Sequence, residues 1–170
     1  RRFLTVQEQI DLFSRWFEAG AADAGFLTVL ALTAAGFSRR KPEFLEQARE
    51  RMQTVANADL DPMPLLGCLD LLLGNVKDAD RHFAVLRDPD LQAWFLNHPG
   101  DRLAAQCEYC RAWLERDVLP GYRDVDASVA DLDAWFADRD VQGFVDRLDR
   151  KASRQIGSDD MTLAWATAGD

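Results

Sequence analysis

The residues best suited to chemistry are two cysteines three positions apart, Cys107 and Cys110. Such a pair holds zinc when two further ligands complete a tetrahedral site, or exchanges electrons as a dithiol in a βαβ setting. The remaining candidate ligands are scattered along the chain: Cys68, His82 and His98. Both cysteines instead share the apolar face of a predicted helix. The other residues of that face are Leu103, Leu114 and Val118. We therefore interpret the pair as core cysteines, and the odd total of three cysteines favours a reducing compartment.

No other arrangement is typical of catalysis or of cofactor binding. Neither histidine has a neighbour in sequence that would exchange a proton with it. The carboxylate pairs, such as Asp131 with Asp133, are two residues apart, which on a helix directs the side chains to different faces. Glycine-rich phosphate loops and the motifs of zinc proteases and serine hydrolases are absent from the sequence. The sequence therefore predicts no catalytic residue, no cofactor and no metal.

One stretch is better suited to recognition than to a core. Arg39, Arg40 and Lys41 form a basic corner between two predicted helices. Charge-assisted hydrogen bonds from these cations would hold an acidic or C-terminal peptide. The alternative is that the cations only complement a helix dipole and add solubility.

A second such stretch surrounds the predicted end of a later helix. Trp113, Arg116, Tyr122 and Arg123 gather there, around Pro120-Gly121. Aromatic residues and arginine are enriched at the centres of protein interfaces. The alternative is that Arg123 pairs with a carboxylate of a neighbouring helix and fixes the corner.

The elements that position these residues are all predicted to be helices. Thr5 and Glu8 are spaced as a capping box. Proline, glycine and aspartate then divide the chain into short segments with helical apolar spacing, and strand alternation is absent. We expect an all-α bundle or superhelix of about eight or nine short helices. Residues 62–73 and 76–87 resemble one tetratricopeptide-type hairpin, although no 34-residue period repeats it. Residues 1–150 are predicted to form this domain, and 151–170 a linker or a weakly docked tail.

Composition limits the function further. The chain has 170 residues, of which 48% are hydrophobic and 29% charged, which is the balance of a globular domain. A net charge of −9 argues against broad nucleic-acid binding. The longest apolar run, residues 26–37, is too short for a membrane span. Because the sequence begins at Arg1, we interpret it as a piece of a longer protein whose membrane anchor, if any, lies outside it.

Four segments in order resemble one family. They are residues 9–13 (QIDLF), 31–42 (ALTAAGFSRRKP), 69–79 (LDLLLGNVKDA) and 113–124 (WLERDVLPGYRD). Residues 132–148 continue the similarity. Together they resemble the helical region of the ZipN family of cyanobacterial cell-division proteins, which includes the plant plastid-division proteins of the accumulation-and-replication-of-chloroplasts class. The resemblance covers roughly residues 3–150. Gly121 stands where the family has a basic residue, and the tail after Arg150 does not match.

The resemblance implies a function. It implies a non-catalytic region that lies between a J-like domain and a single membrane span. The whole protein would tether the FtsZ ring at the cytoplasmic or stromal face of the inner membrane at the division site. The implied partners are the C-terminal peptide of FtsZ and other division proteins. The alternative is a structural spacer or self-association module, a homodimer included, with partner binding done elsewhere in the full-length protein.

Overall fold

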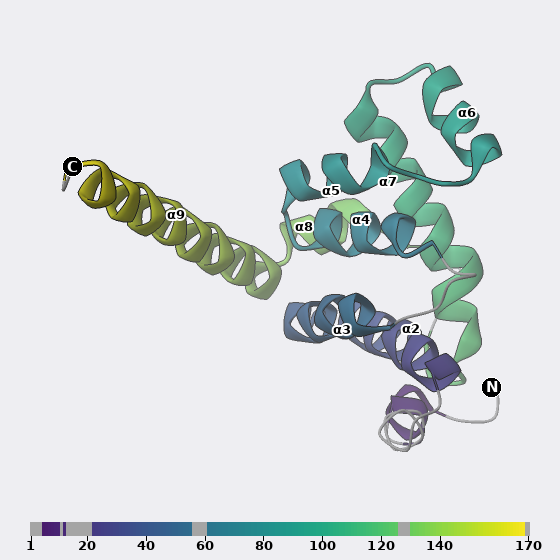
Figure 1. Ribbon diagram of the computed structural model, residues 1–170. Helices are drawn as coiled ribbons and strands as arrows, with labels where there is room; N and C mark the ends of the chain where they lie inside the picture. The colour runs from purple at the N-terminus through teal and green to yellow at the C-terminus, as the bar shows by residue number, and fades with distance from the viewer. Residues whose placement is uncertain (1–4, 11, 13–21, 56–60, 126–129, 169–170) are drawn as a thin grey trace.

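The computed structural model describes residues 5–10, 12, 22–55, 61–125 and 130–168 (Figure 1). These residues contain helices and no strand, which confirms the all-α prediction. Residues 6–10 are helical. The longer helices are α2 (Ala22–Ser38), α3 (Pro42–Thr54), α4 (Met63–Leu72), α5 (Val76–Phe83), α6 (Pro89–Asn97), α7 (Arg102–Trp113), α8 (Leu132–Ala137) and α9 (Arg139–Ala168). A π-helical turn, η1 (Leu114–Val118), and a 3₁₀ turn, η2 (Leu119–Gly121), come after α7.

Local capping signals explain where several helices begin. Glu8 Oε2 accepts a hydrogen bond from Thr5 N at 2.7 Å, and Thr5 Oγ1 accepts one from Glu8 N at 3.3 Å, so the predicted capping box is present. Pro42 is the first residue of α3, where its missing N–H costs nothing. Asp88 and Asp101 cap α6 and α7 through their side chains. These helices therefore begin where the sequence predicts.

The helices stack as consecutive pairs in a superhelix. Figure 1 shows the α2–α3 pair beneath the α4–α5 pair, with α7 running along one side. Contacts connect α3 with α4, and α4 and α5 with α7. Helix α4 is the centre of the core, because all its residues from Pro64 to Leu72 are buried. The hairpin prediction is confirmed: α4 and α5 pack so closely that a Cβ on Gly67 would lie 2.7 Å from the Phe83 ring.

The predicted helix from Asp101 to Val118 differs in its second half. Helix α7 ends at Trp113, and the π-helical turn η1 takes the chain to Val118. Leu114 and Val118 of this turn are buried, as predicted. The prediction of a single apolar face was wrong in part, at two positions of α7 that come before the π turn. Leu103 is 45% exposed and Cys107 is half-buried, whereas Cys110 is fully buried.

The C-terminal helix also differs from the prediction. Helix α9 continues without interruption to Ala168, where a linker or tail was expected from residue 151. Figure 1 shows α9 leaving the stacked helices and extending away from them. Its first turns pack on the body through buried Val141 and partly buried Val145 and Leu148. Gly157 and Ser158 are poor helix formers, which is why the sequence pattern suggests an end before them.

Candidate functional site

The fold brings the two predicted recognition stretches to one place. Arg39 and Arg40 lie at the end of α2, and Asp124 comes shortly after η2. Arg39 Nη2 and Asp124 Oδ2 are 3.7 Å apart. A cavity of about 310 Å³ lies between the two segments, and we call it the Arg40 cavity. Its lining residues are Phe37, Ser38, Arg39, Arg40, Leu119, Asp124, Val125 and Asp131.

Arg40 is the most constrained residue of this cavity. Its φ of 55° lies in the left-handed region, which reverses the chain between α2 and α3. Lys41 N donates to Gly36 O at 2.8 Å and closes the turn. The guanidinium lies over the Phe37 ring at 5.3 Å and the Trp135 ring at 5.8 Å, an arrangement that favours a cation. Arg40 Nη1 is nevertheless buried without a hydrogen-bond partner.

An unpaired buried donor makes the Arg40 cavity suited to a carboxylate. Guanidinium has five N–H donors and no acceptor, and it stays protonated at any ordinary pH. Leaving a buried donor unpaired costs about 1–3 kcal/mol, more for a charged group. A ligand oxygen that accepts from Arg40 Nη1 would remove that cost. The residues present can therefore recognise a carboxylate.

Trp135 supports this site from α8, and sequence reasoning missed it. The side chain is fully buried, and its Nε1 donates to Leu72 O at 2.9 Å. Its ring stacks on Phe37 with the two centroids 5.3 Å apart. These contacts fix the aromatic surface under Arg40. No sequence signal placed Trp135 beside Arg40, because the two residues come from helices far apart in the chain.

The structure places the aromatic residues of the predicted site elsewhere. Trp113 is 6% exposed and Tyr122 is 4% exposed, and both belong to the core. They are therefore not available as surface anchors, and their assignment to a partner-binding surface needs correction. The short loop after η2 turns Tyr122 inward, where a tyrosine ring buries more apolar area than on the surface.

The remaining predicted cations are at the surface. Lys41, Arg116 and Arg123 are exposed. At this corner Arg39 pairs with Asp124. The alternative considered above, an ion pair from Arg123 to a carboxylate of a neighbouring helix, is not seen among the described residues. Asp124 Oδ1 also accepts from Val6 N at 3.0 Å, so this carboxylate connects the N-terminal helix to the corner.

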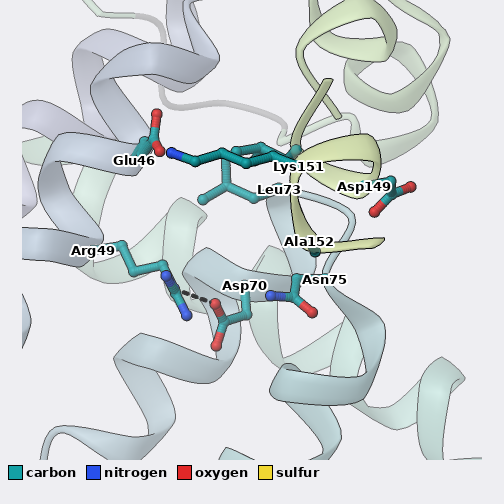
Figure 2. Close-up of a pocket in the computed structure, with 9 residues that line it drawn as sticks. Glu46, Arg49, Asp70, Leu73, Asn75, Asp149, Lys151 and Ala152 are labelled. Atoms are coloured by element: carbon teal, nitrogen blue, oxygen red, sulfur yellow. Dashed lines mark hydrogen bonds and ion pairs between the residues drawn. The ribbon is translucent and has the colours of Figure 1, made fainter. Parts of the chain in front are cut away.

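A second cavity, of about 400 Å³, lies between α3, the α4–α5 turn and α9 (Figure 2). We call it the Asp70 cavity. Its lining residues are Glu46, Arg49, Asp70, Leu73, Asn75, Leu148, Asp149, Lys151 and Ala152. Figure 2 shows Lys151 of α9 extending toward Glu46 of α3. The lining thus carries both charge signs and includes residues from the start of the tail that was expected to be a linker.

Asp70 organises the polar contacts of this cavity. Its side chain is fully buried, is paired with Arg49 Nε, and has its Oδ2 2.6 Å from His82 Nδ1. Burial raises the pKa of Asp70, and the charges of Arg49 and His82 oppose that rise. Arg49 Nη2 also lies 3.9 Å from Asp78 Oδ2. The cluster therefore joins α3, α4 and α5, and its geometry is that of a structural ion-pair network.

Sequence reasoning missed this cluster because its members are far apart in the chain. The available signal was a lone carboxylate, Asp70, inside an apolar run from Leu65 to Leu73. Buried charges of this kind are almost always paired. His82 was interpreted as isolated, and the fold gives it Asp70 as a neighbour.

Two features are absent from the described part of the chain. No group of three or more His, Cys, Asp or Glu residues there is placed to hold a metal ion. Among the same residues, no helix combines the length and the apolar character that crossing a membrane requires.

Comparison with known proteins adds one finding. The family model described as ARC6, plastid division regulator alpha solenoid domain, matches residues 3–168. No curated protein and no solved structure matches the chain. The family match includes all of α9, and so extends beyond residue 150, where the similarity of short motifs ended.

Proposed function

The chain belongs to the plastid division regulator alpha-solenoid family, and on that premise we propose that it is a non-catalytic adaptor for division proteins. In this proposal it binds the C-terminal peptide of FtsZ, or of another division protein, in the Arg40 cavity. The observation that carries the proposal is the buried, unpartnered Nη1 of Arg40 in a cavity beside two aromatic rings. A terminal carboxylate is the group that every C-terminal peptide offers.

The surroundings of the Arg40 cavity favour a peptide over an isolated anion. Phe37 and Leu119 provide apolar lining beside the cation. Arg39, Arg40 and Lys41 are three consecutive cations, and they outnumber the two carboxylates of the lining, Asp124 and Asp131. The local charge is therefore positive in a chain with net charge −9. Such local fields speed the encounter with an acidic partner. A peptide can use both the charge and the apolar lining.

The site of action is part of the same proposal. The full-length protein would work at the cytoplasmic or stromal face of the inner membrane at the division site. Its attachment to the membrane would come from a segment outside this chain.

Calorimetry with two peptides tests the proposal. The 170-residue chain is titrated with the FtsZ C-terminal peptide and with the same peptide amidated at its C-terminus. We expect a Kd of about 10–100 μM for the free acid. A hydrogen bond to a charged group is worth about 1.5–3 kcal/mol, so amidation should weaken binding about 10- to 100-fold. Equal binding of both peptides, or no binding of either at about 0.5 mM, would reject the Arg40 cavity as the binding site.

Helix α9 favours a second candidate function, that of a spacer. Its 30 residues correspond to a rod of about 45 Å, at about 1.5 Å of rise for each residue. A rod that leaves the body in this way would hold the solenoid at a distance from any domain attached to its far end. Small-angle scattering tests this role: deleting residues 152–170 should shorten the maximum dimension, and light scattering on the same samples reports any homodimer.

A further inference from the structure

A third cavity lies between α5, α6 and α7, three helices that are labelled in Figure 1. Its volume is about 310 Å³, and we call it the α6 cavity. The lining residues are Asp80, Phe83, Ala84, Gln92, Phe95, Leu96, Arg102, Ala105 and Gln106. None of them belongs to the Arg40 cavity.

The walls of the α6 cavity combine aromatic and apolar side chains with four polar or charged ones, Asp80, Gln92, Arg102 and Gln106. The Phe83 and Phe95 rings have centroids 5.2 Å apart, and Phe95 also contacts Tyr109 at 5.6 Å. Leu96 is 85% exposed, although it is a large apolar side chain. Helix α6 has no buried residue at all. Apolar surface gathered around a concave site is typical of binding sites for small molecules or side chains.

One polar group in the lining of this cavity has no hydrogen-bond partner. Gln106 lines the cavity and is 3% exposed, and its Oε1 is buried without a hydrogen bond. The orientation of the amide is set by Asp80, because Gln106 Nε2 donates to Asp80 Oδ1 at 3.0 Å and a carboxylate can only accept. Asp80 is in turn 3.4 Å from Arg102 Nη2. The group left for a ligand is therefore an acceptor.

A ligand that fits needs an aromatic body and one N–H donor. A phenylalanine side chain has no donor and would leave Oε1 unpaired. A tyrosine hydroxyl has a donor for Oε1, but its oxygen is also an acceptor. That oxygen would lie beside the Asp80 carboxylate, which has no donor to offer it. The indole of tryptophan has a single donor and no acceptor.

We propose that the α6 cavity binds a tryptophan side chain presented by a partner protein. The indole ring packs against Phe83 and Phe95, and its N–H donates to Gln106 Oε1. The site is separate from the Arg40 cavity, so this inference does not depend on peptide binding there.

Ligand-observed saturation-transfer NMR on the 170-residue chain tests the assignment. The probes are N-acetyltryptophanamide, its 1-methylindole analogue and N-acetylphenylalaninamide. Methylation removes only the indole N–H, and a neutral hydrogen bond of ordinary strength corresponds to about fivefold in affinity. We expect the tryptophan probe to bind about fivefold more tightly than either of the other two. Equal affinities for the three probes would overturn the proposal.

Two variants locate the binding. Ala84→Asp places a charge on the cavity wall and should abolish saturation of the tryptophan probe. Val85→Asp is the matched control, since Val85 is exposed and does not line the cavity. Gln106→Met should remove the difference between the tryptophan probe and its methylated analogue. Unchanged binding to Ala84→Asp, with the fold confirmed by circular dichroism, would place the probe elsewhere and overturn the proposal.

Discussion

Replacing Gly74 with alanine should lower the free energy of unfolding by about 2–5 kcal/mol. Gly74 ends α4 with a φ of 75°, a conformation that costs an L-residue about 1–2 kcal/mol. A Cβ at this position would also clash with Val145 Cγ1 of α9. Forcing a methyl group into such a contact costs about 1–3 kcal/mol more. Gly74 therefore serves both the α4–α5 turn and the packing of α9.

Urea unfolding of four proteins separates these two costs. They are the wild type, Gly74→Ala, Val145→Ala and the double variant. Val145→Ala removes the clashing Cγ1. The double variant should therefore lose about 1–3 kcal/mol less free energy of unfolding than the sum of the losses in the two single variants. The backbone cost at residue 74 should remain.

A control at another glycine tests whether the contact with α9 is responsible. Gly143 lies inside α9, where a Cβ would meet only Arg147 Nη1 at 3.7 Å. Gly143→Ala should therefore stabilise the protein by about 0.5–1 kcal/mol. Additive energies in the four-protein cycle, or an unchanged stability of Gly74→Ala, would refute the proposed contact between the turn and α9.

Three further predictions concern buried groups. Burial raises the pKa of Asp70, so the native state holds this proton to higher pH than the unfolded chain does. The free energy of unfolding therefore falls as pH rises above about 4. Asp70→Asn should flatten that fall in urea titrations between pH 4 and 7. Trp135→Phe leaves Leu72 O unpaired and should cost about 1–3 kcal/mol in thermal or urea unfolding. Cys110→Ser buries a hydroxyl in the core and should lower the free energy of unfolding by about 1–3 kcal/mol. Cys107→Ser changes a half-buried position and should lower the free energy of unfolding by less in the same assay.

Each of these three has a result that contradicts it. A stability that rises with pH between 4 and 7 in the wild type, and not in Asp70→Asn, would mean that the charged form of Asp70 is favoured on folding. An unchanged melting temperature for Trp135→Phe would show that the indole hydrogen bond adds nothing. A larger loss of unfolding free energy in Cys107→Ser than in Cys110→Ser would contradict the assignment of Cys110 as the more buried thiol.

The parts of the fold that depend on neighbouring residues were predictable from the sequence. The Thr5–Glu8 capping box and the start of α3 at Pro42 are set by groups within four residues of one another. The density of apolar residues from Leu65 to Leu73 likewise indicates that α4 is buried on all sides. Such local signals favour a helix at these positions, and the tertiary structure has a helix at the same positions.

The parts that depend on distant residues were not predictable. The π-helical turn after Trp113 is not indicated by the local apolar spacing, because Leu114 and Val118 are buried as an uninterrupted helix would also predict. Trp113 and Tyr122 have the residue types of an interface, yet the loop geometry turns them inward. Arg40 was selected for its charge, while its aromatic support from Trp135 depends on the packing of α8 against the end of α2. A single sequence contains no direct information on such long-range pairs.

Calorimetric titration of an Arg40→Met variant with the FtsZ C-terminal peptide tests the central claim most directly. Methionine keeps an apolar side chain over Phe37 and removes the guanidinium. Arg116→Met is the matched control, since Arg116 is exposed and does not line the Arg40 cavity. The account predicts at least about tenfold weaker binding for Arg40→Met and less than about twofold weaker binding for Arg116→Met, with both variants folded by circular dichroism. Wild-type affinity in Arg40→Met would contradict it.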